Sequence, residues 1–66
     1  MEVQINGVKQ DVSSNSNVSS LLALHSISVQ GIAVAVNGTV VPKTSWSTHV
    51  LQSEDKITII QATQGG

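Results

Sequence analysis

The chain has 66 residues, no cysteine and a formal net charge of −1 at pH 7, so it can form one small domain without disulfides or thiolate metal sites. Three lysines, no arginine and a single aromatic residue, Trp46, exclude the basic clusters and stacking rings that nucleic-acid binding needs. The longest apolar run, residues 32–36, is far too short to cross a membrane, and no signal-peptide pattern opens the chain. We therefore expect one cytoplasmic domain over residues 1–66.

Two strands joined by a tight turn are predicted at the start of the chain. Residues 2–5 alternate polar and apolar side chains, which is typical of a half-buried strand. Asn6-Gly7 is a strong hairpin signal, because both residues tolerate the positive φ of a type I′ turn. Residues 8–12 form the predicted return strand, and their weaker alternation favours an edge position.

A helix is predicted to begin at Val18, with Asn17 as its N-cap. Val18, Leu21, Leu22 and His25 are spaced at i, i+3, i+4 and i+7, so they share one face of the helix. Leu24 lies beside this face. The serines of the other face are mediocre helix formers, so this helix must depend on packing. We interpret His25 as a residue at the edge of the core rather than as a general base or a ligand, because no second polar group lies at helical spacing.

A second hairpin is predicted in the middle of the chain. Residues 32–36 alternate large and small side chains, so the large set should face the helix and the alanines should face outward. Asn37-Gly38 provides the turn. Residues 39–41 form a short strand that stops at Pro42, which cannot donate to a ladder and therefore suits an edge.

A short helical turn is predicted after this hairpin, capped by Thr44 or Ser45 and holding Trp46. We interpret Trp46 as a core residue, with an exposed anchor for a partner as the alternative. His49 should lie on the surface, and residues 52–55 should form a turn.

The last strand is predicted over residues 56–62. Ile57 and Ile59 should face the helix, which leaves Ile60 and Ala62 on the open face of the sheet. Beside the outward-facing alanines, Ile60 and Ala62 are predicted to form a flat apolar surface that docks a partner.

The sequence ends in Gly65-Gly66 soon after this strand. Glycine has no Cβ, so these residues can thread a slot too narrow for a side chain, and a terminal carboxylate is ionised at neutral pH. We expect residues 62–66 to form a flexible arm that presents the carboxylate to another molecule. A frayed end would give the same sequence.

Several features taken together resemble the ThiS family of sulfur carriers, and the resemblance covers essentially the whole chain. They are Asn37-Gly38 followed by Val-Pro-Lys at 41–43, Trp46, the segment 53–57 and the terminal Gly65-Gly66. The resemblance implies an α+β fold of the β-grasp (ubiquitin-like) type. In that fold a mixed sheet of about five strands packs on one helix, and the last strand is central and parallel to the first.

The sequence departs from the family pattern at a few positions. Glu54 stands where the family often has glycine, and because a left-handed conformation would strain a glutamate, we expect a different turn there. His25 occupies a position that is usually apolar, and Gln64 one where small or apolar residues are common. None of these departures touches the terminal diglycine.

The resemblance implies a sulfur carrier of thiamine biosynthesis, which is a protein cosubstrate and not an enzyme. An E1-like adenylating partner would use ATP and Mg to activate the carboxylate of Gly66, while Gly65 and Gln64 thread the partner's channel. A sulfur donor protein would then leave a thiocarboxylate for thiazole synthase. The chain has no set of residues that would activate a nucleophile and no phosphate-cradling loop, which favours a cosubstrate over an enzyme. It should itself bind no cofactor and no metal, since His25 and His49 lie far apart in sequence.

Other functions fit the same residues. The small subunit of molybdopterin synthase shares the diglycine chemistry but is usually longer. A ubiquitin-like modifier would join Gly66 to a protein lysine, and a plain interaction module would carry the tail without using it.

Overall fold

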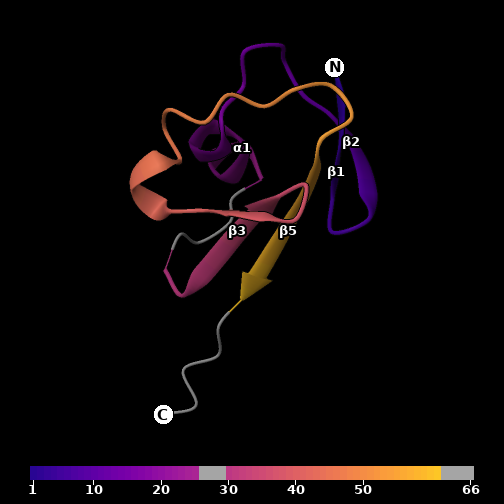
Figure 1. Cartoon of the computed structure of the whole chain (residues 1–66). Helices are drawn as coiled ribbons and strands as arrows, with labels where there is room; N and C mark the ends of the chain where they lie inside the picture. The colour runs from indigo at the N-terminus through magenta and orange to yellow at the C-terminus, as the bar shows by residue number, and fades with distance from the viewer. Residues whose placement is uncertain (26–29, 62–66) are drawn as a thin grey trace.

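The computed structural model describes residues 1–25 and 30–61, which form five strands, one α-helix and one 3₁₀ helix. In chain order these are β1 (Glu2–Ile5), β2 (Val8–Asp11), α1 (Val18–Leu24), β3 (Ile32–Val36), β4 (Thr39–Val41), η1 (Lys43–Ser45) and β5 (Lys56–Gln61). The strands form one mixed sheet in the order β2-β1-β5-β3-β4, and Figure 1 shows β5 between β1 and β3. Because β5 is central, parallel to β1 and antiparallel to β3, the predicted β-grasp fold is confirmed.

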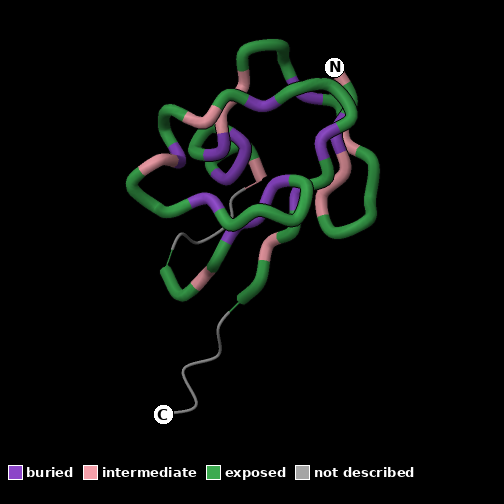
Figure 2. Tube along the Cα trace, viewed as in Figure 1, coloured by how far each residue is buried: buried purple, intermediate pink, exposed green. Residues whose placement is uncertain are grey.

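The hydrophobic core lies between α1 and one face of the sheet. Its buried side chains include Val18, Leu21 and Leu22 from the helix and Val3, Val34, Val36, Val41 and Ile57 from the strands. Figure 2 shows buried stretches on α1 and on the strands of the sheet, while the turns at the periphery are exposed. Full burial of a Val, Leu or Ile side chain contributes about 1.5–3 kcal/mol, so this layer is the main source of stability in a chain without disulfides.

Helix α1 begins where the sequence predicts. The Asn17 side chain accepts a hydrogen bond from the Ser20 N–H at 2.7 Å, and the Ser20 hydroxyl accepts one from the Asn17 N–H at 2.9 Å. This capping box satisfies two of the backbone donors that a helix start leaves free. The predicted N-cap is therefore confirmed.

The predicted burial of Leu24 is wrong, because its side chain is 66% exposed. At 3.6 residues per turn it lies about 110° around the helix from the centre of the buried stripe, beyond the surface that the sheet covers. His25 is the C-cap and is half-buried, as expected of a residue at the edge of the core. Within the described residues its Nε2 atom is buried without a hydrogen-bond partner.

Both Asn-Gly turns have the predicted geometry. The φ angles are 51° and 83° at Asn6-Gly7, and 52° and 84° at Asn37-Gly38, which are the positive values of type I′ turns. The strands β2 and β4 lie at the two edges of the sheet, also as predicted. Strand β2 ends at Asp11, one residue earlier than expected.

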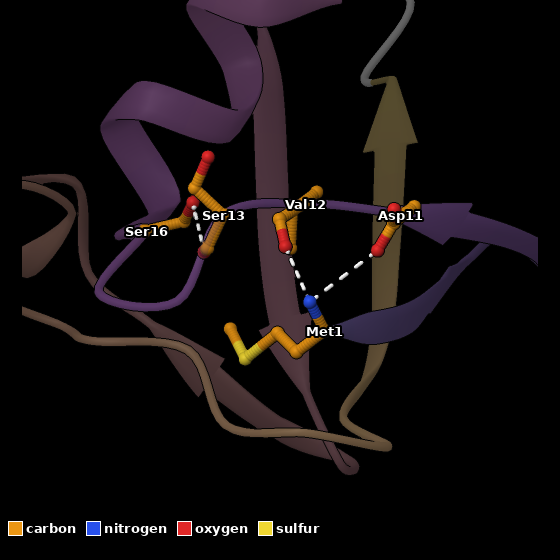
Figure 3. A network of polar contacts seen from close by, with 5 residues as sticks. All are labelled: Met1, Asp11, Val12, Ser13 and Ser16. Atoms are coloured by element: carbon orange, nitrogen blue, oxygen red, sulfur yellow. Dashed lines mark hydrogen bonds and ion pairs between the residues drawn. The ribbon is translucent and has the colours of Figure 1, made fainter.

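A polar network closes the first hairpin onto the segment that leads to α1 (Figure 3). The terminal ammonium of Met1 donates to the Val12 carbonyl at 2.7 Å and lies 3.3 Å from the Asp11 carboxylate. The Ser16 hydroxyl donates to the Ser13 carbonyl at 2.7 Å. Because the Asp11 side chain is 92% exposed, the ion pair contributes little, and the contact to the Val12 carbonyl matters more.

The predicted capping of the short helical turn is wrong. Thr44 and Ser45 lie inside η1, whose N-cap is Pro42 with no side-chain hydrogen bond. The turn begins early because the Pro42 carbonyl already accepts the Ser45 N–H at 2.8 Å. Trp46 is only 4% exposed and its Nε1–H donates to the Val41 carbonyl at 2.9 Å, so its role as a core residue is confirmed and the exposed-anchor alternative is wrong. His49 is half-buried rather than fully on the surface.

The expectation of a different turn at Glu54 is also wrong. Glu54 adopts the left-handed conformation, with φ 72°. Its N–H donates to the Glu2 carbonyl at 2.7 Å, and the Gln4 N–H donates to the Asp55 carbonyl at 2.9 Å. These bonds to β1 fix the turn and outweigh the strain of a side chain at positive φ.

Two predictions fall outside the described residues. Strand β5 is described as far as Gln61, so Ala62 as the strand end and residues 62–66 as an arm are not placed. Residues 26–29 are not described either. In the described ranges, no helix is long and apolar enough to cross a membrane.

Candidate functional site

Strand β5 carries buried side chains on one face of the sheet and exposed ones on the other. Ile57 is 1% exposed, and the partly buried Ile59 packs against the same core. Ile60 points the other way and is 55% exposed. The predicted phase of this strand is therefore confirmed, and Ile60 stands on the open face of the sheet.

Ile60 belongs to an apolar surface that three strands build. This open-face patch consists of Ile60, Ala33, Ala35 and Val40. Register pairs Ala33 with Ile60, and Ala35 with both Thr58 and Val40, so these side chains share one face. Val40 is 64% exposed, whereas Ala35 is only 9% exposed because larger neighbours flank its methyl group. The patch is thus flat in its middle and carries a branched side chain on each side.

The contribution of Val40 to this patch was not foreseen from the sequence. Val40 and Val41 are adjacent and chemically identical, so composition alone cannot say which of them faces the core. Pairing of Val34 with Val41 places Val41 on the covered face, where it is 6% exposed. The alternation along β4 then puts Val40 on the open face.

The other half of the open face is polar. Gln4 of β1 pairs with Lys9 of β2 and with Lys56 of β5, which places these three side chains on that face. Glu2 and Asp11 form the next pair of the hairpin on this face. The open face is therefore divided along β5, with apolar side chains toward β3 and β4 and polar ones toward β1 and β2.

The start of β5 is held by the second Asn-Gly turn. The Asn37 N–H donates to the Lys56 carbonyl at 2.7 Å, and the Lys56 N–H donates back to the Asn37 side-chain oxygen at 2.9 Å. Asn37 Nδ2 also donates to Asp55 at 2.8 Å, and Asp55 accepts the Gln52 N–H at 2.8 Å. Asp55 is 7% exposed, so its carboxylate is buried with its oxygens paired, as burial of a charge requires.

The end of β5 is held by the first Asn-Gly turn. The Asn6 N–H donates to the Ile57 carbonyl at 2.9 Å. Its side-chain oxygen accepts the Ile59 N–H at 2.8 Å, and its Nδ2 lies 3.4 Å from the Ile59 carbonyl, a longer and weaker contact. Each Asn-Gly turn therefore uses its asparagine side chain to extend the pairing of β5.

The described residues offer no metal-binding cluster. In residues 1–25 and 30–61, no three His, Cys, Asp or Glu side chains gather so that they could hold a metal ion. The whole sequence also contains no cysteine.

The remaining predicted site residues, Ala62, Gln64, Gly65 and Gly66, lie outside the described residues. Ile60 is the predicted site residue that lies within the described part of the chain. Gln61 is the last described residue and still belongs to β5, which is held by neighbours on both sides at Ile57 and Ile59.

The model of the ThiS family matches residues 2–66. The chain belongs to the ThiS family. It is 29% identical over 66 residues to the sulfur carrier protein ThiS of Escherichia coli strain K12, and the match covers 100% of both chains.

Two solved structures of a thiamine biosynthesis protein (ThiS) from Geobacter metallireducens have the same fold. The crystal structure gives a TM-score of 0.88 at 22% identity and covers 100% of both chains. The solution NMR structure gives a TM-score of 0.75 at 22% identity, covering 100% of this chain and 88% of the other. These likenesses show that the five-stranded sheet with one helix is the fold of known ThiS proteins.

Proposed function

We propose that this ThiS-family chain carries sulfur on the carboxylate of Gly66 and delivers it for the thiazole of thiamine. Membership of the family, and the likeness to a sulfur carrier protein over the full length, make it a carrier and not a catalyst. The observation that carries the proposal is the position of Ile60, which is 55% exposed on the central strand, six residues before Gly66. A firmly held strand thus offers a docking surface next to the segment that ends in the reactive carboxylate.

The chemistry requires activation by another protein. A carboxylate is a poor electrophile, so an E1-like adenylating enzyme with ATP and Mg converts the Gly66 carboxylate to an acyl-adenylate and releases pyrophosphate. Sulfide released by a donor protein then attacks the acyl carbon, a C–S bond forms, the C–O bond to AMP breaks, and the S–H proton is lost to water. The resulting thiocarboxylate is the sulfur source for thiazole synthase, and these steps take place in the cytoplasm.

Each predicted site residue has one task in this scheme. Ile60 and Ala62 contact the adenylating enzyme through their apolar side chains. Gln64 and Gly65 thread the channel that leads to ATP, where the lack of a Cβ on Gly65 permits a narrow passage. The chain contributes no cofactor, because the partner binds the ATP and the metal.

The thiamine pathway is favoured over the small subunit of molybdopterin synthase because the family match and the named relatives belong to ThiS. A ubiquitin-like modifier would give a different product. It would yield an isopeptide bond between Gly66 and a lysine, which mass spectrometry distinguishes from a thiocarboxylate.

The test is thiocarboxylate formation by the intact chain. Wild-type protein incubated with the cognate adenylating enzyme, ATP and a sulfur source should gain the mass difference between sulfur and oxygen at its C-terminus. Deletion of Gly66 leaves the carboxylate about 3.5 Å short of the reaction centre, and Gly65→Val places a branched side chain in the channel. We expect both variants to lose the mass gain while their thermal melting curves stay unchanged.

A matched control is Gln64→Ala, which keeps the length of the chain and both glycines. This variant should still gain the sulfur mass. Equal mass gain by the chain that lacks Gly66 would show that the carboxylate of the tail is not the carrier group.

A further inference from the structure

The pairing between β1 and β5 continues past the point where β1 ends. Strand β1 stops at Ile5 and the chain reverses at Gly7, so no backbone of β1 lies opposite Ile59. In this place the Asn6 side chain accepts the Ile59 N–H at 2.8 Å and directs Nδ2 at the Ile59 carbonyl, 3.4 Å away. The side-chain amide thus replaces the backbone amide that a longer β1 would have supplied.

Asn6 is suited to this task by its chemistry and by its conformation. Its φ of 51° is one that asparagine tolerates better than most residues, so the turn forms and the side chain still reaches β5. A carboxamide carries an acceptor and a donor on one group, and a strand backbone presents the same pair. Glycine would satisfy the turn equally well but would leave Ile59 unpaired on this side.

The contact lies next to the docking surface. Ile59 directly precedes Ile60, and the opposite side of this part of β5 is paired with β3 through Ala33 and Ile60, and through Ile32 and Gln61. With Asn6 in place, β5 is bonded on both sides up to the residue before Ile60. Without it, the bonding of β5 on the β1 side ends at Ile57.

We propose that Asn6 is a positioning residue for docking, whose side chain holds the end of β5 so that Ile60 meets the adenylating enzyme in a fixed orientation. This inference rests on the proposed function. If the end of β5 samples several positions, only a fraction of the chains is ready to dock, and the apparent affinity falls by that fraction. Once docked, the enzyme itself holds the strand, so the rate of the bound complex stays the same.

The second turn supplies a matched control. Asn37→Gly removes the same side chain from the same turn type, but at the start of β5, where the bonds go to Asp55 and the Lys56 N–H. Both substitutions suit a positive φ, so both variants keep their turns. They differ in which end of β5 they release.

The experiment measures the kinetics of adenylation by ATP–pyrophosphate exchange with the cognate E1-like enzyme. It compares wild type, Asn6→Gly and Asn37→Gly at a temperature where all three are folded. We expect Asn6→Gly to raise KM for the carrier roughly 3- to 10-fold, the equilibrium equivalent of about one lost hydrogen bond, with kcat unchanged. Hydrogen exchange of the Ile59 amide should also accelerate in this variant, because the acceptor of its N–H is removed. Asn37→Gly should leave both quantities at their wild-type values, although its melting temperature falls.

The outcomes separate this inference from the function on which it rests. Adenylation of wild type combined with an unchanged KM for Asn6→Gly overturns the positioning role alone. An equal rise in KM for both variants also overturns it, because the effect would then come from general loosening of the sheet. If the wild-type chain is not adenylated at all, the proposed function fails and the role of Asn6 in docking fails with it.

Discussion

Ile57 and Ile60 are the same residue type on the same strand, three positions apart, yet they do different things. Ile57 is 1% exposed and fills the core beneath α1, whereas Ile60 is 55% exposed in the open-face patch. Hydrophobicity therefore does not distinguish the buried isoleucine from the exposed one, for which we propose a role in docking. The register of β5 does, because successive side chains of a strand point to opposite faces of the sheet.

That register is fixed from both sides of the strand. The bonds of Asn37 and Asp55 set the start of β5, and those of Asn6 set its end. A slip by one residue would exchange the two faces, burying Ile60 and exposing Ile57. The two asparagine side chains therefore add to the stability of the sheet, while the backbone pairing of β5 with β1 and β3 sets the face on which each isoleucine lies.

We expect the largest effect on stability from shortening Ile57, the buried isoleucine of the two. Ile57→Ala removes a fully buried branched side chain and leaves a cavity, so we expect a loss of about 2–5 kcal/mol in the free energy of unfolding. Ile60→Ala is the matched control and should cost less than about 1 kcal/mol, because much of that side chain is already in water. Chemical denaturation of both variants measures the difference, and equal losses would contradict the assignment of faces.

An intermediate effect should appear in binding when the exposed member is made charged. Ile60→Asp places a carboxylate in the open-face patch, where docking would bury it, so we expect affinity for the adenylating enzyme to fall by about tenfold or more. The fold should remain, with a stability change below about 1 kcal/mol. Titration calorimetry measures the affinity, and circular dichroism follows the fold.

Gln4→Asp is the control for that experiment. It introduces the same charge on the same open face, but in the polar half beside Lys9 and Lys56. We expect near wild-type affinity. If Ile60→Asp unfolds the chain instead, Ile60 belongs to the core, and the assignment of Ile57 and Ile60 to opposite faces of the sheet is wrong.

The smallest effect concerns the turn that starts β5. Glu54 holds φ 72° with an exposed side chain, a conformation that glycine adopts without strain. After allowing for the greater freedom of glycine in the unfolded chain, we expect Glu54→Gly to raise the free energy of unfolding by about 0.5–1 kcal/mol. A higher melting temperature with unchanged affinity for the adenylating enzyme would support this, whereas a lower one would mean that the Glu54 side chain stabilises the turn.

Local patterns predicted most elements of this fold well. The cap formed by Asn17 and Ser20 needs only contacts within the first turn of α1. The two Asn-Gly turns follow from the preference of these residues for positive φ. Two of the errors arose where a contact distant in sequence decides. Leu24 is exposed because the sheet does not extend over it, and Glu54 accepts strain because β1 bonds its N–H.

The candidate site divides in the same way. The alternation of residues 56–60 was sufficient to place Ile60 on the open face, since the period of a strand is a local property. The sequence alone could not show that Val40 joins Ile60 on that face, or that Asn6 bonds Ile59, 53 positions further along the chain. Those facts depend on which strands become neighbours, and that is decided by burying the apolar faces of the whole sheet against α1 at once.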